Sequence, residues 1–389
     1  MPDLDSVVLW DQAAQQAVIN TEVGSTLERE VSAADWDESQ LYIQSEVPSS
    51  PSLSATTNNL FSIQGSGTSA QLKCTLTQAS VWLVNEVGVF AVDDDRGTID
   101  GIAPGSAGYV EAALNRGQVI FSALSSLPDG YTGVGLTRHL SLPTNQPLMF
   151  YLVQNGTTDT VLAGGSNAAN VFFSSSSGNP DGLNHLQVSD QGNGVYNLAW
   201  EDYLGGGDQD FNDMMLNVEL SNPSSLNDWM GVQQGKREVM DLNLETDLLS
   251  ANLIVNKEAA YDNTFGWYRV ADSNGGIDVN RDGQVDLRPG DPNYAKVAVE
   301  QRIDLSSGLA SGGFLVPFLI ADGTPEEFLA LNSRNQHRNA PLAYFVFLGA
   351  NPDQFDHVRL LGDNTFGFED KFNGGDRDYN DLVVKVSFT

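Results

Sequence analysis

The sequence is poor in cysteine and in positive charge. Its 389 residues include one cysteine, Cys74, so no disulfide can form within the chain. Cys74 lies in an alternating stretch, residues 71–76, which indicates a small core residue of a strand rather than a nucleophile. Lys and Arg number 19 against 51 Asp and Glu, a net charge of −32. This charge argues against nucleic acid and anionic lipid surfaces as partners, and bound cations would relieve it.

Long apolar runs and signatures of catalysis are also missing. No stretch approaches the length of a transmembrane span, so we expect no transmembrane segment. Residues 1–5 lack the basic and apolar regions of a signal peptide. Either a leader is not part of this sequence, or export uses another route, or the protein stays inside. There is no Ser-His-Asp order, glycine-rich phosphate loop or zinc signature, so we expect no enzyme.

Turn-forming residues are abundant. The chain holds 38 Gly with many Ser, Asn and Thr, while apolar residues at 41% and charged residues at 18% describe a globular protein. Short β-branched and aromatic stretches alternate with Gly, Asn, Ser and Pro clusters, which predicts strands. We therefore predict a mostly β fold of two tandem β-sandwich domains with short helical insertions, preceded by a helix-containing N-terminal segment.

The predicted organisation has four parts. Residues 1–58 form an N-terminal segment and linker, 59–221 the first sandwich, 222–236 a linker and 237–389 the second sandwich. Helix-forming composition predicts a helix over residues 7–19, which either packs on the first domain or docks on a neighbouring molecule. Further helices are expected at 107–116, 294–302 and 325–331. The predicted strands are 60–63, 72–77, 81–84, 89–92, 119–123, 148–153, 171–174, 185–189, 214–220, 238–244, 251–256, 267–270, 313–320, 343–348, 357–361 and 382–388.

One motif occurs twice, at residues 200–213 and 368–381. Each copy places an aromatic-Glu-Asp, a Gly-Gly turn and an Asp-x-Asp-aromatic-Asn-Asp run directly before a strand with period-2 alternation, and the copies align without a gap. Turn chemistry alone explains Asp and Asn in one such loop, but it does not require identical acids in two. The glycines bring the acids together, and Ca²⁺, which takes six to eight oxygen ligands, removes their repulsion. The candidate ligands are Glu201, Asp202, Asp208, Asp210 and Asp213 in the first copy, and Glu369, Asp370, Asp376, Asp378 and Asp381 in the second.

A second repeated element precedes each acidic motif. The sequence Asn-Pro-Asp, followed by a histidine, occurs at residues 179–185 and again at 351–357. Neither histidine has a Cys or a second His beside it in sequence, so we interpret each as a strand residue that ties down the turn rather than as a zinc ligand. The added candidates for calcium ligands are Asn179, Asp181, Asn351 and Asp353.

A different acidic loop lies early in the second copy. Residues 278–286 match the start of an EF-hand-like calcium loop, with a glycine at the sixth position. The twelfth position is Pro289 rather than Glu, so the loop resembles shorter dockerin-type loops, or Asp291 closes it; a solvated acidic turn is the alternative. In the first copy, residues 93–100 place Arg96 where Asp282 stands, so we expect that site to be weak or lost. The candidate ligands are Asp278, Asn280, Asp282, Gln284 and Asp286.

Taken together, the repeated motifs resemble the DUF4114 family. They include Asn-x-x-Gly at 85–88 and 263–266, the Pro-Gly helix starts at 104–109 and 289–294, and the two acidic hairpins. The resemblance covers about 80–220 and 262–389. It implies an extracellular or cell-surface, calcium-linked β module, because the family occurs in large secreted or surface proteins of bacteria, cyanobacteria especially.

The sequence thus leads to two functional hypotheses. The first is a non-catalytic extracellular structural or adhesive protein that binds Ca²⁺ and self-assembles into filaments, the N-terminal segment pairing with a sheet edge of an identical subunit. The second is a calcium-dependent carbohydrate-binding module for surface polysaccharide. In the second, one coordination position stays open beside Tyr203, Phe211 or Tyr379.

Overall fold

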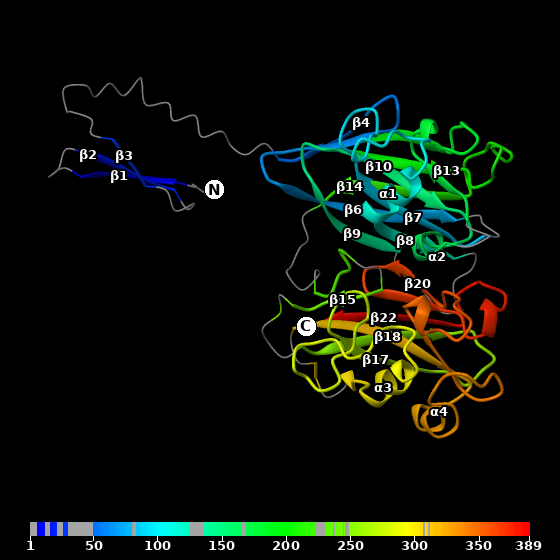
Figure 1. Ribbon diagram of the computed structural model, residues 1–389. Coiled ribbons are helices and arrows are strands. Elements are labelled where there is room, and N and C mark those ends of the chain that lie inside the picture. The colour runs from blue at the N-terminus through cyan, green and yellow to red at the C-terminus, as the bar shows by residue number, and fades with distance from the viewer. Residues whose placement is uncertain are drawn as a thin grey trace. The chain divides into compact units, whose positions relative to one another are not determined.

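The chain folds into two units of very different size. The computed structural model describes residues 6–11, 16–21, 26–29, 50–79, 83–124, 136–164, 169–221, 230–235, 238–243, 245, 249–305, 308–309 and 312–389. Contacts divide the chain into Met1–Ser49 and Ser50–Thr389 (Figure 1). None of the helices in these described ranges is both long and apolar enough to span a membrane.

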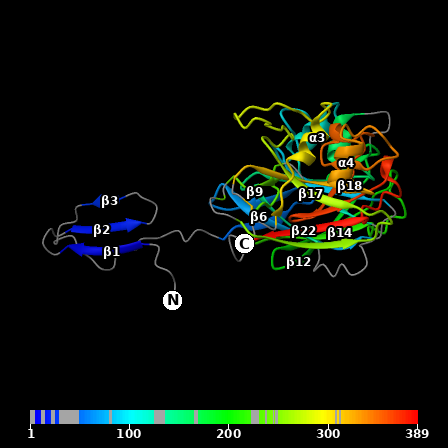
Figure 2. The same ribbon diagram turned by 90° about the horizontal axis from the view of Figure 1, so that it is seen from below.

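The N-terminal unit is a small antiparallel sheet, and the helix predicted over residues 7–19 is wrong. Its strands are β1 (Ser6–Asp11), β2 (Gln16–Thr21) and β3 (Thr26–Arg29), in that order (Figure 2). Val8 of β1 pairs with Ile19 of β2. The β-branched residues at both ends of the predicted helix favour extended backbone, and this preference outweighs the Ala and Gln residues between them.

The boundary predicted at residue 58 also moves. Strand β4 (Ser52–Ala55) lies inside the predicted linker and pairs with β5 (Phe61–Gln64), with Leu53 opposite Ile63. Both side chains are buried in the core of the first sandwich. The larger unit therefore begins at Ser50.

The first sandwich consists of two antiparallel sheets that face each other. One has the order β4-β5-β10-β7-β8, with β11 also on β10, and the other the order β12-β13-β14-β6-β9. Their inner faces supply one apolar core, which includes Phe61, Phe150, Trp200 and Leu216. The remaining strands are β6 (Ser69–Ala79), β7 (Asn85–Ala91), β8 (Gln118–Ala123), β9 (Thr137–Pro143), β10 (Pro147–Val153), β11 (Val171–Phe173), β12 (Leu186–Gly192), β13 (Val195–Trp200) and β14 (Met214–Leu220).

Two short helices cover the outer face of the first of these sheets. They are α1 (Tyr109–Arg116) and α2 (Thr158–Ala163). Tyr109 packs there with Met149 and Phe173 in a second apolar cluster. Helix α1 lies where the sequence predicted it, whereas α2 was not predicted. The short helical insertions are therefore confirmed as part of a mostly β fold.

The second sandwich repeats this arrangement. Its sheets have the orders β15-β18-β17, with β19 on β18, and β16-β22-β21-β20. Helix α4 has the predicted bounds because Thr324 and Glu327 form a capping box and Pro325 occupies the first turn. The elements are β15 (Met240–Asp241), β16 (Ala251–Lys257), β17 (Thr264–Val270), α3 (Tyr294–Glu300), β18 (Phe314–Ala321), α4 (Pro325–Leu331), β19 (Leu342–Phe345), β20 (Val358–Gly362), β21 (Thr365–Phe368) and β22 (Leu382–Phe388).

The two sandwiches pack against each other through a buried ion pair and an apolar cluster. Arg138 of β9, whose side chain is 2% exposed, donates to Asp363 Oδ1 at 2.9 Å, directly after β20. The other oxygen of Asp363 lies 2.6 Å from His139 Nδ1. Leu136 and Leu361 meet in a cluster drawn from both sandwiches. The tandem is therefore one packed unit.

Replacing Asp363 should destabilise this unit strongly. The Asp363→Ala variant leaves the buried Arg138 guanidinium without its carboxylate, which costs about 3–5 kcal/mol. Urea unfolding measures the loss. A double variant, Arg138→Met with Asp363→Ala, should recover much of it because no charge is then left buried. Glu300→Gln, in an exposed pair with Lys296, should change stability by less than about 0.5 kcal/mol. A loss at Asp363 no greater than at Glu300 would contradict the assignment.

Candidate metal centre

The first acidic hairpin joins β13 to β14 through a chain of left-handed residues. Gly205, Gly206 and Gly207 have φ of 88°, 84° and 44°, and Gln209 and Phe211 have φ of 60° and 54°. Glycine adopts such angles without strain. The loop therefore coils tightly and keeps its acids within a few residues of one another.

The last glycine of each turn also makes room for a carboxylate. A side-chain carbon at Gly375 would lie 2.6 Å from Glu369 Oε1, and one at Gly207 would lie closer still to Glu201 Oε1. Only a residue without Cβ permits this approach. The glycine and the glutamate that precedes the turn thus form one structural pair in both copies.

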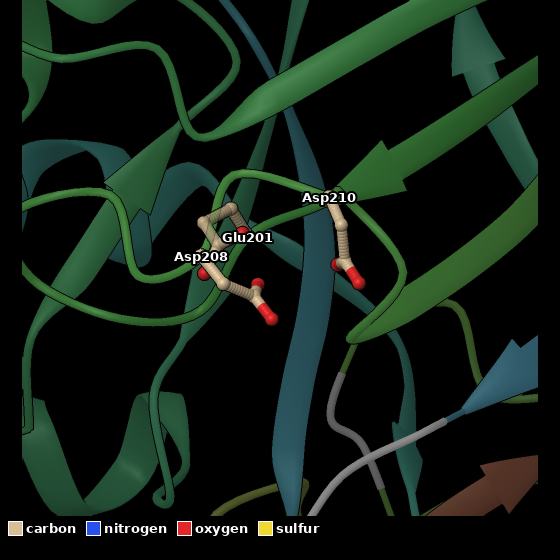
Figure 3. Close-up of side chains that lie close together, drawn as sticks. All are labelled: Glu201, Asp208 and Asp210. Atoms are coloured by element: carbon tan, nitrogen blue, oxygen red, sulfur yellow. The ribbon is translucent and has the colours of Figure 1, made fainter.

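Three carboxylates converge in the first hairpin. One oxygen each from Glu201, Asp208 and Asp210 lie within 4.8 Å of one another, with Glu201 buried and the two aspartates exposed (Figure 3). Two ligands on opposite sides of Ca²⁺, at about 2.4 Å each, are about 4.8 Å apart. This separation therefore suits oxygens that share one calcium ion.

The second hairpin brings together all five of its predicted carboxylates. Glu369, Asp376 and Asp378 form one group within 4.8 Å, and Glu369, Asp370 and Asp381 form another. Glu369 belongs to both. The second group is buried throughout, so this hairpin offers a deeper set of oxygens than the first.

Asp202 and Asp213 lie outside the carboxylate group of the first hairpin, and they support the shape of the loop. Asp213 Oδ2 accepts the backbone N–H of Asp202 at 2.9 Å, and Asp381 Oδ2 accepts that of Asp370 at 2.8 Å. Each bond links the chain entering the hairpin to the chain leaving it. Asp202 and Asp213 thus lie at the base of the loop, while Asp208 and Asp210 lie at its outer side.

Two asparagines that sequence reasoning left without a role hold this base. Asn85 Nδ2 donates to Asp202 Oδ2 at 2.6 Å, and Asn263 Nδ2 donates to Asp370 Oδ2 at 2.7 Å. Both begin the repeated Asn-x-x-Gly element, so the recurrence was the signal that could have found them. Each amide orients the Oδ2 atom of its aspartate, Asp202 or Asp370, and does not bond to the Oδ1 atom.

Two of the buried oxygens have no partner among the described residues. Glu201 and Asp370 are each 2% exposed, yet Glu201 Oε2 and Asp370 Oδ1 accept no hydrogen bond from that part of the chain. A buried carboxylate oxygen without a donor is costly. A bound cation would satisfy both atoms, and the oxygen-only donor set is the one that calcium prefers.

Burial and crowding raise the pKa values of the two hairpin glutamates. Burial, followed by repulsion from Asp213 and Asp208, raises the pKa of Glu201 to about 7. Burial, followed by repulsion from Asp381 and Asp376, raises the pKa of Glu369 to about 8. Without a cation, the fold therefore favours the neutral form of Glu201 and Glu369 more than water does.

The Asn-Pro-Asp turns lie beside the hairpins, and their oxygens are already used. Asn179 Oδ1 accepts the N–H of Phe173, and Asn351 Oδ1 accepts that of Phe345. Asp181 Oδ2 accepts from Gly205 at 2.8 Å, and Asp353 Oδ2 accepts from Asn373 at 2.7 Å. The two aspartates fix the position of the glycine turn, the two asparagines bond to the preceding strand, and neither aspartate joins a carboxylate group described above.

The histidines complete this support, as the sequence predicted. His185 Nδ1 lies 2.8 Å from Glu201 O and its Nε2 lies 3.0 Å from Asp181 Oδ2, while His357 repeats both contacts. The ring of His185 stacks on Phe172. Partial burial opposes ionisation of Asp181, but the N–H groups of Gly205 and Leu183, with His185, hold its pKa down at about 2. Both ring nitrogens are engaged, so neither histidine is placed to bind zinc.

The EF-hand-like loop is well formed, but its acids are spread out. Asp278 accepts backbone N–H bonds from residues 281–283, Asp286 accepts two from residues 279 and 280, and Asp282 Oδ1 accepts that of Gln284. Asn280 Oδ1 in turn accepts the N–H of Asp282. The described residues 278–286 contain no acidic group within 4.8 Å of the kind seen in the hairpins.

The first-copy loop predicted to correspond, residues 93–100, is closed by an arginine, but its contacts equate it with residues 271–278, because Tyr109 donates to Gly97 O and Tyr294 donates to Gly275 O. Arg116 of α1 donates to Asp93 and to Asp100, at 2.6 Å in both cases. A side-chain cation therefore already bridges the two acids at the ends of this loop. That this copy has a weak or lost metal site stays a prediction.

Each acidic hairpin lies in a region of the chain that matches a model of a protein family. The family described as "Domain of unknown function (DUF4114)" matches residues 142–221 and 309–389. The chain carries two DUF4114 domains in tandem. Each match ends with the hairpin and the last strand, so both acidic motifs lie within the family's own pattern. No curated protein and no solved structure matches the chain.

The DUF4114 matches are shorter than the resemblance predicted from sequence. The Asn-x-x-Gly strands and the Asp-rich loops lie before residues 142 and 309, outside the matches. The structure nevertheless repeats these elements, since β7 and β17 occupy equivalent places beside β10 and β18. Each DUF4114 match therefore forms the second part of a larger repeated sandwich.

The raised pKa values predict how stability depends on pH without divalent metal. A carboxyl whose pKa is higher in the folded state contributes stability below its ordinary pKa and loses it as pH rises through the folded value. In chelator, the midpoint of thermal unfolding should therefore fall as pH rises from about 4.5, the ordinary pKa of a glutamate, to about 8, the raised pKa of Glu369. Glu201→Gln with Glu369→Gln should flatten the fall, and excess calcium should abolish it by favouring the ionised form. A midpoint that rises over this interval in chelator would contradict the geometry.

Proposed function

We propose that this protein is a non-catalytic structural or adhesive component of a cell surface or extracellular matrix, built from two calcium-stabilised β-sandwiches. One observation carries the proposal: the same acidic hairpin with converging carboxylates occurs at the same place in both domains. Each copy also holds a buried carboxylate oxygen without a partner among the described residues, on Glu201 in the first and on Asp370 in the second. Its partners would be calcium ions, together with either identical subunits or surface polysaccharide.

Calcium would act on folding rather than on a reaction. The ion would neutralise the carboxylates around Glu201 and Glu369 and tie the hairpin to the strand that follows it. Strands β14 and β22 lie inside their sheets, between β13 and β6 and between β21 and β16. Ordering the hairpin therefore fixes an internal strand, and the free energy of metal binding becomes folding free energy.

The charge of the chain supports the same function. A net charge of −32 destabilises a compact state through self-repulsion. Divalent cations bound in both domains would reduce this repulsion at the acidic hairpins, where the carboxylates lie closest together. An extracellular location, where calcium is abundant, would keep the sites filled.

Calcium should raise the thermal unfolding midpoint of the full chain. At about 100 times the dissociation constant, each site adds about 2.7 kcal/mol to the free energy of unfolding. Differential scanning calorimetry with calcium and with EGTA measures the shift. Glu369→Gln should remove the part due to the second hairpin, whereas Glu111→Gln, on the exposed face of α1, should leave the shift unchanged. An identical midpoint in calcium and in EGTA would refute the proposal.

A second candidate function, glycan binding, is favoured by a pocket beside the second hairpin. The pocket has a volume of about 340 Å³ and is lined by Phe372, Arg334 and Arg338 among others. The Arg338 guanidinium lies 3.9 Å from the centroid of the Phe372 ring, which leaves its N–H edges available for a carboxylate. Of the aromatic residues predicted to flank a sugar, Tyr203 is exposed, whereas Tyr379 is 1% exposed and cannot stack on a ligand.

The loop that carries these arginines is held rigidly. Asn332 Oδ1 accepts the N–H groups of Gln336 and His337. Asn335 exchanges two hydrogen bonds with the backbone of Ala343. Preorganised arginines of this kind suit acidic sugars.

A glycan array separates the two functions. Acidic polysaccharide fragments should bind in calcium if the pocket is a ligand site, and Arg338→Ala should abolish the signal. Arg96→Ala, at an exposed arginine of the first sandwich, is the matched control. The structural function alone predicts no calcium-dependent signal on any glycan.

A further inference from the structure

Strand β16 forms one edge of the second sandwich and exposes a run of apolar residues. Leu253, Ile254 and Val255 are 39%, 57% and 43% exposed. Soluble proteins usually protect an edge strand with charges, proline or a covering segment. This edge carries a single charged residue, Lys257, at its end.

The interior of the sandwich is open along this edge. Leu253 pairs with Val386 of β22, and Val255 pairs with Val384, both of which are buried in the core. Directly paired residues point to the same face of a sheet. Leu253 and Val255 therefore face the core, and their exposure shows that nothing within the described chain closes it there.

The backbone hydrogen bonds between β16 and β22 show which residues of β16 direct their N–H and C=O groups to the free edge. Ser250 and Thr389 exchange both backbone hydrogen bonds, and Glu258 N–H donates to Asp381 O. In an antiparallel ladder such pairs alternate, so even-numbered residues bond to β22. The N–H and C=O groups of residues 251, 253, 255 and 257 therefore point to the free edge.

In the first sandwich the strand equivalent to β16 is β6, and a further strand covers its edge. There β9 pairs with β6 from Ser69↔Pro143 to Thr75↔Thr137. In the second sandwich only Leu309 keeps such a contact, as a bridge to Leu249, while Ile303 bridges to Trp267 in the other sheet. Within the described residues, the second copy thus lacks the strand that protects the first.

We propose that β16 pairs antiparallel with β16 of a second copy of this chain, about a twofold axis at Ile254. In this register residue 253 faces 255 of the partner strand and residue 251 faces 257. All outward-pointing backbone groups of both strands are then paired. The two four-stranded sheets become one continuous sheet.

The side chains of β16 are complementary to themselves in this register. Leu253 would lie beside Val255 of the second copy, and together they would close both open cores. On the outer face Ile254 would meet its own equivalent, and Asn252 would meet Asn256. Lys257 would face Ala251, so no like charges are opposed.

Charge sets the strength of the association. Each copy has a net charge of −32, and one strand pair buries less than a standard interface. The dimer should therefore be weak and should be strengthened by salt, which screens the repulsion.

Sedimentation of the full chain over a concentration series tests the dimer. The wild type should show a concentration-dependent dimer. Ile254→Lys would place two lysines face to face, so its dissociation constant should rise at least about tenfold. Leu331→Lys, at a 63% exposed leucine of α4, should behave as the wild type. A dimer that is unaffected by Ile254→Lys, or a wild type that stays monomeric throughout the series, would overturn the proposal.

Disulfide trapping tests the register. Residue 254 would form a non-hydrogen-bonded pair, with Cα atoms about 4.5 Å apart, a separation at the short end of those that a disulfide spans. The single native cysteine, Cys74, is buried and does not compete. Ile254→Cys should therefore oxidise to a covalent dimer far faster than Leu331→Cys or Asn252→Cys. Equal rates for all three would exclude pairing, and fastest trapping through Asn252→Cys would exclude this register.

Discussion

Repulsion between carboxylates confined in a glycine turn is the constraint on which the rest of this structure depends. The glycines remove the steric barrier to crowding, as the approach of Glu369 to Gly375 shows, but they do nothing to offset the charge. The fold therefore surrounds each hairpin with donors, from Asn85 or Asn263 on one side and from the Asn-Pro-Asp turn on another. These donors orient the acids and leave one buried oxygen of Glu201 and one of Asp370 without a partner in the described part of the chain, an arrangement that a hard cation would complete.

Duplication kept this support and changed what surrounds it. Histidine, asparagine and glutamate keep the same contacts in both copies. The Asp-rich loop has diverged in length, since residues 278–286 lie between the bridged residues Ile277 and Leu287, where the first copy has only two residues between Ile99 and Ile102. An arginine pairs with an aspartate of the loop in both copies, Arg116 with Asp93 and Arg288 with Asp272. The edge has diverged as well, because β9 covers β6 while no strand within the described residues covers β16. Along this edge the second sandwich is therefore the more open of the two.

Sequence reasoning missed strands β4, β9, β13 and β21 and helix α2, and two of these elements have weak local signals. Strand β21 has four residues with a glycine among them, and α2 has six residues in a threonine-rich stretch. Their conformation comes from pairing with β22 and from packing on the outer face of a sheet, both of which are long-range contacts. The error at residues 7–19 has the opposite cause, because a helix-like composition was given more weight than β-branched residues at both ends.

The sequence alone determined the β class, the duplication, the DUF4114 family and the acids of both hairpins, because each depends on residues that lie close together along the chain. Only the tertiary structure decided which of those acids meet. Asn179 and Asp181 fit a ligand pattern, yet their atoms bond to the backbone, while Asn85 reaches Asp202 across 117 positions. The Arg138–Asp363 pair between the sandwiches and the free edge of β16 were likewise invisible in the sequence. Contacts between distant segments depend on how sheets stack and which strands they lack, and no local pattern encodes that.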